Sequence, residues 1–374
     1  MKYYIIAGEA SGDLHGSRLI RAIKKNDAQA SFRAWGGDLM LEEGVSLVKH
    51  YREMAFMGFI EVLFNIRKII SNLQLCKKDI IAFHPDAIIC IDYPGFNLPI
   101  AKFSKRYGFK TIYYISPQVW AWKEKRVRDI KNNIDQMLVI LPFEKSFYNR
   151  WNYDVEYVGH PLIETIEEFK HSERALKIKN EFAQRDKKIV AILPGSRKQE
   201  IHTKLPIMLK ATTAFKNIEF IVAQAPGIDD GVINEHIKHF KNVSIWKNKT
   251  YELLSIADAA VVTSGTATLE TALFGVPEVV CYKTSRISFL LARSFIKVKF
   301  ISLVNLIMDK MVIKELIQDD MIPDNIEEEL KSLLNNDSKR NQMKADFQAL
   351  QQVLHSGGNA SKNAAEKIQA LLSS

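Results

Sequence analysis

Short apolar segments alternate with helix-like segments along this chain, and this alternation limits the possible folds more than any other feature. Segments typical of buried strands occur at 3–7, 31–34, 87–91, 111–115 and 136–140. Helix-like stretches separate them, for example around residues 19–25. Such alternation is typical of βαβ units, in which a parallel sheet carries helices on both faces. We therefore predict a doubly wound α/β domain over the first part of the chain.

The alternation stops after residue 159 and then starts again. Residues 166–187 are charged and helix-prone, and we expect a linker helix there. Further strand-like segments follow at 189–193, 218–224, 243–246, 259–264 and 278–282. A length of 374 residues agrees with two domains at about 100–200 residues each. We predict two Rossmann-like α/β domains, 1–165 and 188–345, facing each other across a cleft at the carboxyl ends of their strands. Helices at 346–374 should pack on the first domain or on a partner chain.

Composition narrows the setting of the protein. Lysine and arginine outnumber aspartate and glutamate by 52 to 43, which gives a net charge of +9. The excess suggests an anionic partner, such as nucleic acid, an acidic membrane or a phosphorylated ligand, although a merely basic surface would also explain it. The three cysteines lie far apart without a CxxC pair, which fits a reduced cytosolic protein. We expect no secretory signal and no membrane-spanning helix, because no uncharged apolar run is long enough.

The segment TSGTATLETALFGVP at 263–277 is the most informative one. A strand-like run ends there in a small-residue turn that leads directly into a helix. The free N–H groups and the positive dipole end of such a helix suit a diphosphate, which points to Ser264, Gly265 and Thr266. Glu270 lies about one turn further, within reach of ribose hydroxyls. The alternative is a plain helix start capped by Ser264 or Thr266.

Two other charged residues directly follow predicted strands. Arg197, in LPGSRKQEI, would face the predicted cleft and could neutralise a departing diphosphate. It could equally pair with Glu200 on a helix surface. Asp92, in IDYPGFNLP, suits a general base. Its alternative role is that of a turn or helix-cap residue before Pro94.

Two segments suggest contacts with lipids or polyanions. The stretch 54–73 places many apolar residues on one broad helical stripe, as expected for acyl-chain or membrane contact or for ordinary core packing. The stripe contains Ile60, Val62, Leu63, Ile66, Ile69 and Ile70. The stretch 116–133 mixes tryptophans with basic residues, a pattern found in nucleic-acid sites, phosphate sites and solvated helices.

Several common motifs are missing from the sequence. It has no DxD triplet, no GxGxxG fingerprint and no GxxxxGK[ST] loop. A metal-bridged diphosphate of the aspartate type, a dinucleotide and a Walker-type nucleotide site are therefore not expected. His236 and His239 lack a third ligand nearby in sequence, and we interpret them as surface residues without a metal.

Seven segments together resemble the lipid-A-disaccharide synthase family. They are GEASGD (8–13), MGFIEVL (57–63), SPQVWAWKEKRV (116–127), LPFEKSFY (141–148), PGSRKQEI (194–201), SGTATLE (264–270) and SLVNLI (302–307). Each alone is weak, but they occur in the family's order over nearly the whole chain. The resemblance implies an inverting glycosyltransferase of the GT-B type. Its reaction moves 2,3-diacylglucosamine from UDP to the 6-hydroxyl of 2,3-diacylglucosamine 1-phosphate, which gives a β-1,6 disaccharide phosphate and UDP.

The resemblance also implies roles for particular residues. Asp92 corresponds to the proposed base, and Arg197 would stabilise departing UDP in place of a metal. Other positions implied at the UDP-sugar donor are Ser196, Ser264, Gly265, Thr266, Glu270 and Asn305. Glu9, Ser11 and Gly12 would line the cleft near the acceptor or the transferred sugar. No cofactor is implied, because the UDP-sugar is a substrate.

The family further implies a peripheral protein at the cytoplasmic face of the inner membrane of Gram-negative bacteria, and it leaves a homodimer open. One departure is Gly95, where relatives are expected to carry a second acid after Asp92. Two rival interpretations remain. One is an isomerase similar to UDP-N-acetylglucosamine 2-epimerase, and the other is a non-catalytic protein that binds a membrane surface or nucleic acid through residues 116–133.

Overall fold

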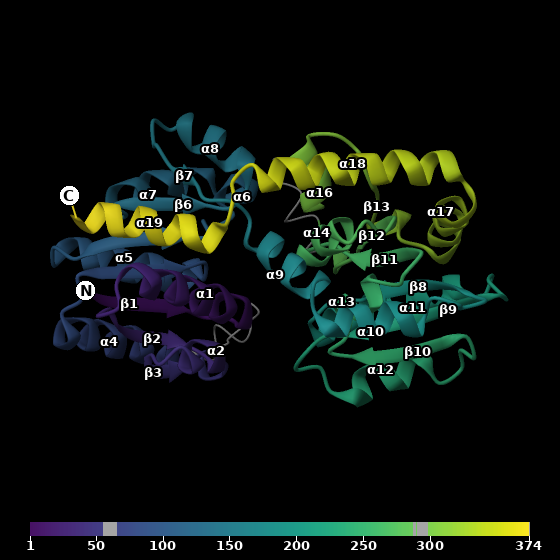
Figure 1. Ribbon diagram of the computed structural model, residues 1–374, viewed down its shortest axis with the longest axis horizontal. Coiled ribbons are helices and arrows are strands. Elements are labelled where there is room, and N and C mark those ends of the chain that lie inside the picture. The colour runs from purple at the N-terminus through teal and green to yellow at the C-terminus, as the bar shows by residue number, and fades with distance from the viewer. Residues whose placement is uncertain (55–65, 287–288, 290–297, 374) are drawn as a thin grey trace. The chain divides into compact units, whose positions relative to one another are not determined.

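The computed structural model describes residues 1–54, 66–286, 289 and 298–373. These residues form two compact units (Figure 1). Unit 1 contains residues 1–161 and 354–374, and unit 2 contains residues 162–353. The boundaries differ from those expected in that residues 162–187 and 346–353 belong to unit 2, whereas the last segment of the chain packs on unit 1, which is one of its two expected positions.

Unit 1 contains a seven-stranded parallel sheet in the order β3-β2-β1-β4-β5-β6-β7. Its strands are β1 (Lys2–Ala7), β2 (Ser31–Gly36), β3 (Ser46–His50), β4 (Ala87–Ile91), β5 (Lys110–Tyr114), β6 (Gln136–Val139) and β7 (Glu156–Tyr157). The inner strands are fully buried because apolar residues occupy both of their faces, as in IIA and AIICI. This explains why they were predictable as continuous apolar runs.

Helices lie on both sides of this sheet (Figure 1). The described helices of unit 1 are α1 (Ala10–Asn26), α2 (Asp38–Glu42), α4 (Ile66–Phe83), α5 (Pro94–Arg106), α6 (Val119–Trp122), α7 (Val127–Asn133), α8 (Pro142–Asn149) and α19 (Ala360–Ser373). Helix α1 contacts α19, whereas α5 contacts both α4 and α7. The apolar faces of α1 and α19 join β1 and β4 in one core that includes Leu19, Ile23, Ile89 and Ile368.

Unit 2 contains a six-stranded parallel sheet in the order β10-β9-β8-β11-β12-β13. Its strands are β8 (Lys188–Leu193), β9 (Ile218–Gln224), β10 (Val243–Lys247), β11 (Ala259–Thr263), β12 (Glu278–Tyr282) and β13 (Lys314–Ile317). Its helices are α9 (Pro161–Lys170), α10 (Glu173–Glu181), α11 (Lys198–Thr212), α12 (Asp230–Ile237), α13 (Thr250–Leu254), α14 (Thr266–Leu273), α16 (Leu303–Met308), α17 (Pro323–Asn335) and α18 (Asp337–His355). The prediction of two doubly wound Rossmann-like units is therefore confirmed.

Three strands were not predicted, and all three are edge strands. β3, β7 and β13 lie at the outer positions of their sheets. Edge strands are less covered by helices, and accordingly β3 and β7 are only partly buried and β13 mixes buried with exposed residues. Such segments lack the continuous apolar run by which the central strands were recognised.

The expected linker helix over 166–187 is two helices in the structure, α9 and α10. Ser172 separates them: its hydroxyl donates to the carbonyl of Phe169 at 2.6 Å and accepts from the backbone N–H of Ala175 at 3.3 Å. Serine in this position satisfies a free N–H at the start of a helix and thereby favours a new helix start. Helix α10 and all of α9 after Pro161 belong to unit 2.

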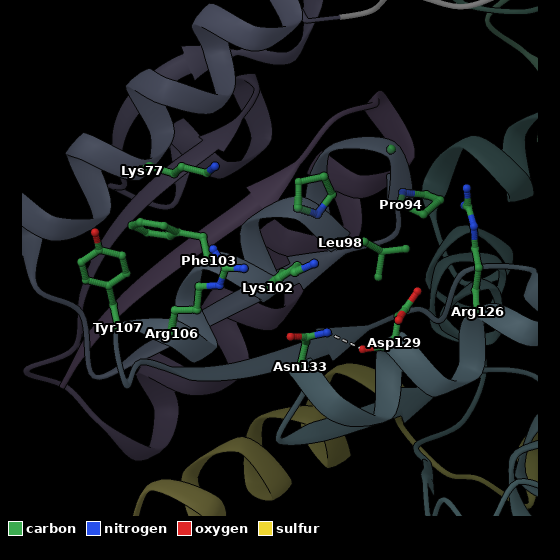
Figure 2. Close-up of a pocket in the computed structure, with 12 residues that line it drawn as sticks. Lys77, Pro94, Leu98, Lys102, Phe103, Arg106, Tyr107, Arg126, Asp129 and Asn133 are labelled. Carbon is green, nitrogen blue, oxygen red and sulfur yellow. Dashed lines mark hydrogen bonds between the residues drawn. The ribbon is translucent and has the colours of Figure 1, made fainter.

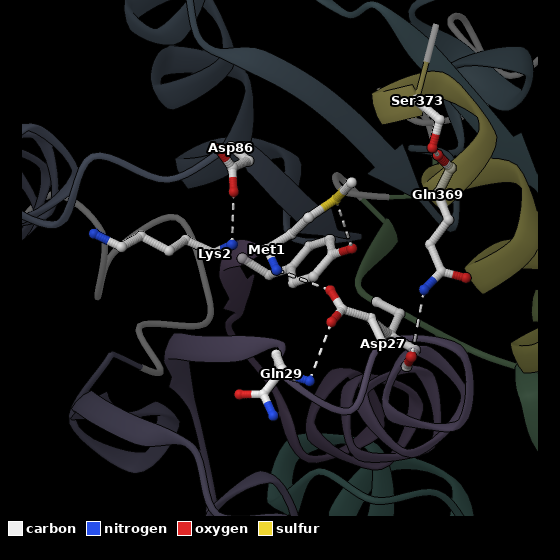
Figure 3. Close-up of polar contacts among 9 residues, drawn as sticks. Met1, Lys2, Asp27, Gln29, Asp86, Gln369 and Ser373 are labelled. Atoms are coloured by element: carbon white, nitrogen blue, oxygen red, sulfur yellow. Dashed lines mark hydrogen bonds and ion pairs between the residues drawn. The ribbon is translucent and has the colours of Figure 1, made fainter.

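Helix α19 attaches to unit 1 by apolar packing and by polar contacts at its rim. Its residues Ala364, Ala365 and Ile368 are fully buried in the unit 1 core. Gln369 donates to the carbonyl of Ile23 at 3.4 Å and accepts from the side chain of Asn26 at 2.9 Å. Figure 3 shows Gln369 beside the segment where the Met1 ammonium group pairs with Asp27 at 2.8 Å. The end of the chain is thus an integral part of the first unit.

Within the part of the chain that the structure describes, none of the helices combines the length and the hydropathy needed to cross a bilayer.

The position of α19 leads to a stability prediction. Replacing Ile368 by alanine should lower the free energy of unfolding by about 2–5 kcal/mol, because it leaves a cavity in the unit 1 core. Urea denaturation followed by tryptophan fluorescence measures this change. Lys362→Ala, on the exposed side of the same helix, is the matched control and should change stability little. Equal stability of both variants would show that α19 contributes little to the core.

Candidate active site

Each sheet reverses its strand order at one point, and the predicted site residues gather at these two points. In unit 1, β1 and β4 are neighbours and Ala7 pairs with Ile91. Asp92 follows Ile91 directly, and Glu9 follows Ala7 after Gly8. In unit 2, β8 and β11 are neighbours and Leu193 pairs with Val262. Open α/β sheets bind ligands beyond the carboxyl ends of their strands at such reversals.

Asp92 lies in an unusual backbone conformation after β4. Asp92 and Tyr93 have φ values of 43° and 48°, both in the left-handed region. For residues other than glycine this conformation costs about 1–3 kcal/mol each, and it is concentrated at functional sites. The sharp turn ends the strand, and α5 begins immediately after Tyr93. Asp92 is therefore a turn residue, as the alternative interpretation held, but one whose backbone is strained.

Buried polar side chains hold this turn in place. The Asn97 amide donates to the carbonyls of Asp92 at 2.7 Å and of Ile91 at 3.2 Å. The Tyr113 hydroxyl also donates to the Asp92 carbonyl, at 2.5 Å. Both side chains are fully buried, so they cannot rearrange without losing packing. The surrounding core therefore stabilises the strained backbone, and Asp92 as a residue keeps part of its surface accessible to solvent.

The local environment raises the pKa of Asp92 to about 6. The main cause is that protein atoms packed around the carboxyl group displace water, which disfavours its charged form. The negative charge of Glu9 is the second cause. A hydrogen bond from the backbone of Tyr93 opposes them. A carboxylate with this pKa is ionised at neutral pH and is a stronger base than an ordinary aspartate.

The GEASGD segment forms the end of β1 and the first turn of α1. Glu9 precedes the helix and Ser11 is exposed in its first turn. Gly12 is buried against Ala7, where a Cβ atom would approach the Ala7 Cβ to 3.0 Å. Gly8 allows the Tyr93 ring to lie over the loop, since a Cβ there would approach that ring to 2.4 Å. The segment therefore brings Glu9 and Ser11 to the carboxyl ends of the central strands, where Asp92 also lies.

Asp13, in the same segment, has a structural role. Its carboxylate accepts hydrogen bonds from the backbone N–H groups of Gly37 at 2.7 Å, Leu39 at 3.1 Å and Met40 at 3.1 Å. Asp13 is buried, and these bonds tie α1 to the start of α2. The last acid of GEASGD thus fixes the loop.

A second acid of unit 1 was missed by sequence reasoning. Glu144, in LPFEKSFY, is buried, and burial raises its pKa to about 7. Its carboxyl group contacts the Ser116 hydroxyl at 2.8 Å and the Leu141 N–H at 2.9 Å. Ser116 in turn lies 3.0 Å from the Tyr148 hydroxyl. The network joins the SPQVW and LPFEKSFY segments, whose long-range pairing no local pattern reveals.

In unit 2, the SGT turn carries an open helix start. Gly265 precedes α14 with a φ of 155°, a conformation that favours glycine. The Ser264 hydroxyl donates to the carbonyl of Ile301 at 3.0 Å. Neither Ser264 nor Thr266 caps α14, because Gly265 is the cap residue and it has no side chain that could bond the first N–H groups. Gly265 and Thr266 are exposed, which leaves the first N–H groups of α14 available to a ligand.

Glu270 lies in the second turn of α14. Its carboxylate accepts a hydrogen bond of 2.7 Å from the hydroxyl of Tyr251 in α13. Burial raises the pKa of Glu270, and the bond from Tyr251 opposes this shift. The carboxyl group is therefore held in one orientation, while a second oxygen can accept a further donor.

Asn305 is fully buried, and protein groups use all of its hydrogen-bonding capacity. Its amide donates to the Ile313 carbonyl at 2.8 Å and to Glu315 at 2.9 Å. Its oxygen accepts from the N–H groups of Val312 at 2.8 Å and Ile313 at 3.0 Å. Glu315 also accepts from the N–H groups of Ile301 and Ser302. This cluster fixes the 301–305 segment, which contacts the SGT turn through Ser264.

Arg197 lies between β8 and α11 and is exposed together with Ser196. One guanidinium nitrogen of Arg197 lies 3.7 Å from a carboxylate oxygen of Glu200. The pair with Glu200 that the alternative interpretation proposed is therefore present. The arginine side chain nevertheless keeps 61% of its surface exposed, so the pair leaves it accessible.

The apolar stripe is described only in part. Ile60, Val62 and Leu63 lie outside the described residues. Ile66 and Ile70 begin α4 and are each 49% exposed, and Ile69 is partly buried. Ile70 follows Ile66 by four residues and Lys77 follows Ile70 by seven, which places all three on the same face of α4.

A groove of about 790 Å³ lies beside this face, between α4, α5 and α7. Four cationic side chains line it, Lys77, Lys102, Arg106 and Arg126, with Asp129 as the acid (Figure 2). Its apolar lining includes Leu98, Phe103 and Tyr107. Pro94 and Gly95, directly after the Asp92–Tyr93 turn, line its other end. Sequence reasoning missed this groove, because its cations come from three segments that lie apart in the chain, around residues 77, 102–106 and 126.

Comparisons with known proteins agree with the resemblance of the motifs. A family model described as lipid-A-disaccharide synthetase matches residues 3–369. The lipid-A-disaccharide synthase of Syntrophus aciditrophicus (strain SB) is 40% identical over 367 residues, which cover 96% of this chain and 95% of that protein.

Solved structures agree with the fold. UDP-GlcNAc 2-epimerase from Neisseria meningitidis, bound to UDP-GlcNAc, superimposes with a TM-score of 0.70 at 12% identity over 100% of both chains. The calicheamicin glycosyltransferase CalG4 gives a TM-score of 0.60 at 14% identity, over 100% of this chain and 98% of its own. At these identities the likeness concerns the fold alone. With the family model matching nearly its whole length, the chain belongs to the lipid-A-disaccharide synthetase family.

Proposed function

We propose that this protein transfers 2,3-diacylglucosamine from UDP-2,3-diacylglucosamine to the 6-hydroxyl of 2,3-diacylglucosamine 1-phosphate. The products are the β-1,6-linked lipid A disaccharide 1-phosphate and UDP. The observation that carries the proposal is the position of the family motifs, which place their charged residues at the strand-order reversals of both sheets. Neither a nucleic-acid motif nor a dinucleotide fingerprint competes for these positions.

Unit 2 is proposed to bind the UDP part of the donor. The first N–H groups of α14, at Gly265 and Thr266, would bind the diphosphate together with Ser264, Ser196 and the Arg197 guanidinium. Glu270, oriented by Tyr251, would accept the ribose hydroxyls. The UDP-sugar seen with the structurally similar epimerase supports this assignment. Asn305 is proposed to position the 301–305 segment rather than to touch the donor, because its side chain is fully bonded within the protein.

Unit 1 is proposed to supply the base. Asp92 would take the proton from the acceptor 6-hydroxyl as the hydroxyl oxygen attacks C1 of the donor sugar. The bond between C1 and the UDP oxygen then breaks with inversion, and both bonding electrons leave with UDP. Glu9 raises the basicity of Asp92, and Glu9 and Ser11 would border the acceptor or the transferred sugar. Gly12, which the sequence also suggested for this position, is buried against Ala7 and would instead allow α1 to pack close to β1.

The negative charge that develops on UDP would be stabilised by Arg197 and by the start of α14. A guanidinium and a helix N-terminus both favour a diphosphate, and each acts most strongly where water is excluded. We therefore propose a transfer step in which protein groups, without a metal ion or a cofactor, stabilise the leaving group.

We further propose that unit 1 rests on the inner, cytoplasmic face of an anionic membrane. The exposed Ile66 and Ile70 could enter the interface, and Lys77 on the same face of α4 leads to the cationic groove (Figure 2). Exposed apolar side chains next to cations are the usual combination in peripheral membrane proteins. The net charge of +9 acts in the same direction.

The function is tested by measuring UDP release from the purified protein in detergent with EDTA. We expect release from UDP-2,3-diacylglucosamine only when 2,3-diacylglucosamine 1-phosphate is present. Release that ignores the acceptor, or conversion of a UDP-sugar into its epimer, would contradict the proposal.

Two variants test the assigned roles in the same assay. Asp92→Asn should lower kcat by about 10²- to 10⁴-fold, the usual contribution of a general base. Arg197→Ala should lower kcat by about 10²- to 10³-fold, as expected for loss of a group that stabilises developing charge. The matched controls are Asp154→Asn, an exposed acid of unit 1, and Lys210→Ala, at the far end of α11. Both controls should keep full activity.

Stability measurements separate a catalytic role of Asp92 from a structural one. The pKa of Asp92 is about 6 in the folded protein, above the value of about 3.9 in an unfolded chain. Its ionised form therefore lowers stability as the pH rises through this range. Asp92→Asn should unfold at the same or a higher urea concentration at neutral pH, and a large loss of stability would indicate a structural role.

Membrane association is tested by co-sedimentation with vesicles. Lys102→Gln/Arg106→Gln should bind phosphatidylglycerol-rich vesicles about 30-fold more weakly, at about 1 kcal/mol for each cation. Lys187→Gln/Lys216→Gln, which removes two exposed cations of unit 2, is the control with the same net charge. Equal losses in both double variants would show that net charge, not the groove, determines binding.

A further inference from the structure

Unit 2 contains a cluster of metal-ligating side chains outside the proposed donor site. His202 lies in the second turn of α11, and Glu235 and His236 lie near the end of α12. One potential ligand atom from each residue lies within 4.8 Å of the others. His202 and Glu235 are about half exposed, and the His236 side chain is 19% exposed. The cluster is thus accessible from solvent and lies on two helices that pack together.

The three atoms already have the spacing of a coordination sphere. Nδ1 of His202 lies 3.2 Å from Nε2 of His236. The carboxylate oxygen of Glu235 lies 3.1 Å from the former nitrogen and 3.4 Å from the latter. Bonds from zinc to nitrogen or oxygen measure about 2.0–2.2 Å, so tetrahedral ligands lie about 3.3 Å from one another. Small side-chain movements would therefore place an ion at equal distance from all three.

We propose that His202, Glu235 and His236 bind one divalent transition-metal ion of the zinc class, with water in the fourth position. Two imidazoles and one carboxylate favour zinc, nickel or copper. Magnesium and calcium prefer oxygen ligands throughout, so they should not bind here. The expectation that His236 is a surface residue without a metal is thereby revised. Its ligand partner is His202 from another helix, not His239.

An ion at this position would join α11 to α12. The same helices are joined at their beginnings by an ion pair between Lys198 and Asp229, at 2.6 Å. Helix α11 starts directly after Arg197, so the ion would stabilise the helix that carries this loop. Because an ion that binds only the folded state stabilises it, occupancy should raise the melting temperature. The proposed metal site does not take part in the transfer reaction. The transfer step itself is still proposed to use no metal ion.

The test uses the full chain after removal of any affinity tag and after treatment with EDTA and dialysis. Calorimetric titration with zinc chloride should show one site per chain and a higher melting temperature. Cobalt(II) provides a spectroscopic probe, because its four-coordinate complexes absorb visible light far more strongly than the hydrated ion. The wild-type protein should show this absorption, and excess zinc should abolish it.

Three single variants locate the site. His202→Gln and His236→Gln should weaken zinc binding at least tenfold and remove the cobalt absorption, since loss of even a residue that only hydrogen-bonds to a ligand costs about 10- to 100-fold. His239→Gln, an exposed histidine just beyond α12, should bind like the wild type. Circular dichroism confirms that each variant is folded.

Two results would overturn the proposal. One is a wild-type protein without the strong cobalt absorption, which would show that the three side chains only form hydrogen bonds with one another. The other is unchanged zinc binding in His202→Gln and His236→Gln, which would place the ion elsewhere.

Discussion

The backbone turn at Asp92 and Tyr93 is the constraint on which the rest of unit 1 depends. Two consecutive residues adopt the left-handed backbone conformation, which is sterically unfavourable for residues other than glycine. Asn97 and Tyr113, both buried, hold the Asp92 carbonyl and so stabilise this conformation. As a result, Asp92 remains at the carboxyl end of β4, near the charge of Glu9. The buried side chains of Asn97 and Tyr113 thereby fix the position of Asp92, whose pKa is higher than that of an ordinary aspartate.

Unit 2 also has a parallel sheet with one strand-order reversal, but different chemical groups lie at this reversal. Its SGT turn contains no acid, and Gly265 leaves the first N–H groups of α14 open. The neighbouring segment is fixed by a buried network around Glu315 and Asn305, which connects to the turn through Ser264. One sheet reversal therefore presents negative charge and the other presents N–H groups and Arg197. This difference in charge suits a base and a diphosphate respectively.

The sequence predicted the central strands and the residues that follow them, because both depend on local patterns. AIICI must be buried on two faces, and a polar residue after it must lie at the sheet edge. Edge strands such as β3 escaped prediction because their partial burial leaves no continuous apolar run. The Glu144 network, the cationic groove and the His202–His236 pair escaped it for another reason. Each joins residues far apart in sequence, and only the tertiary fold sets their distances.

The most direct measurement is the pH dependence of kcat/KM for the wild-type protein and for Glu9→Gln. If Asp92 is the base, activity should fall as the pH decreases through about 6. Removing the negative charge of Glu9 should move this fall to lower pH, because that charge contributes to the raised pKa. An acidic limb at the same pH in both proteins, or one near the ordinary pKa of aspartate, would contradict the assignment of Asp92 as the base.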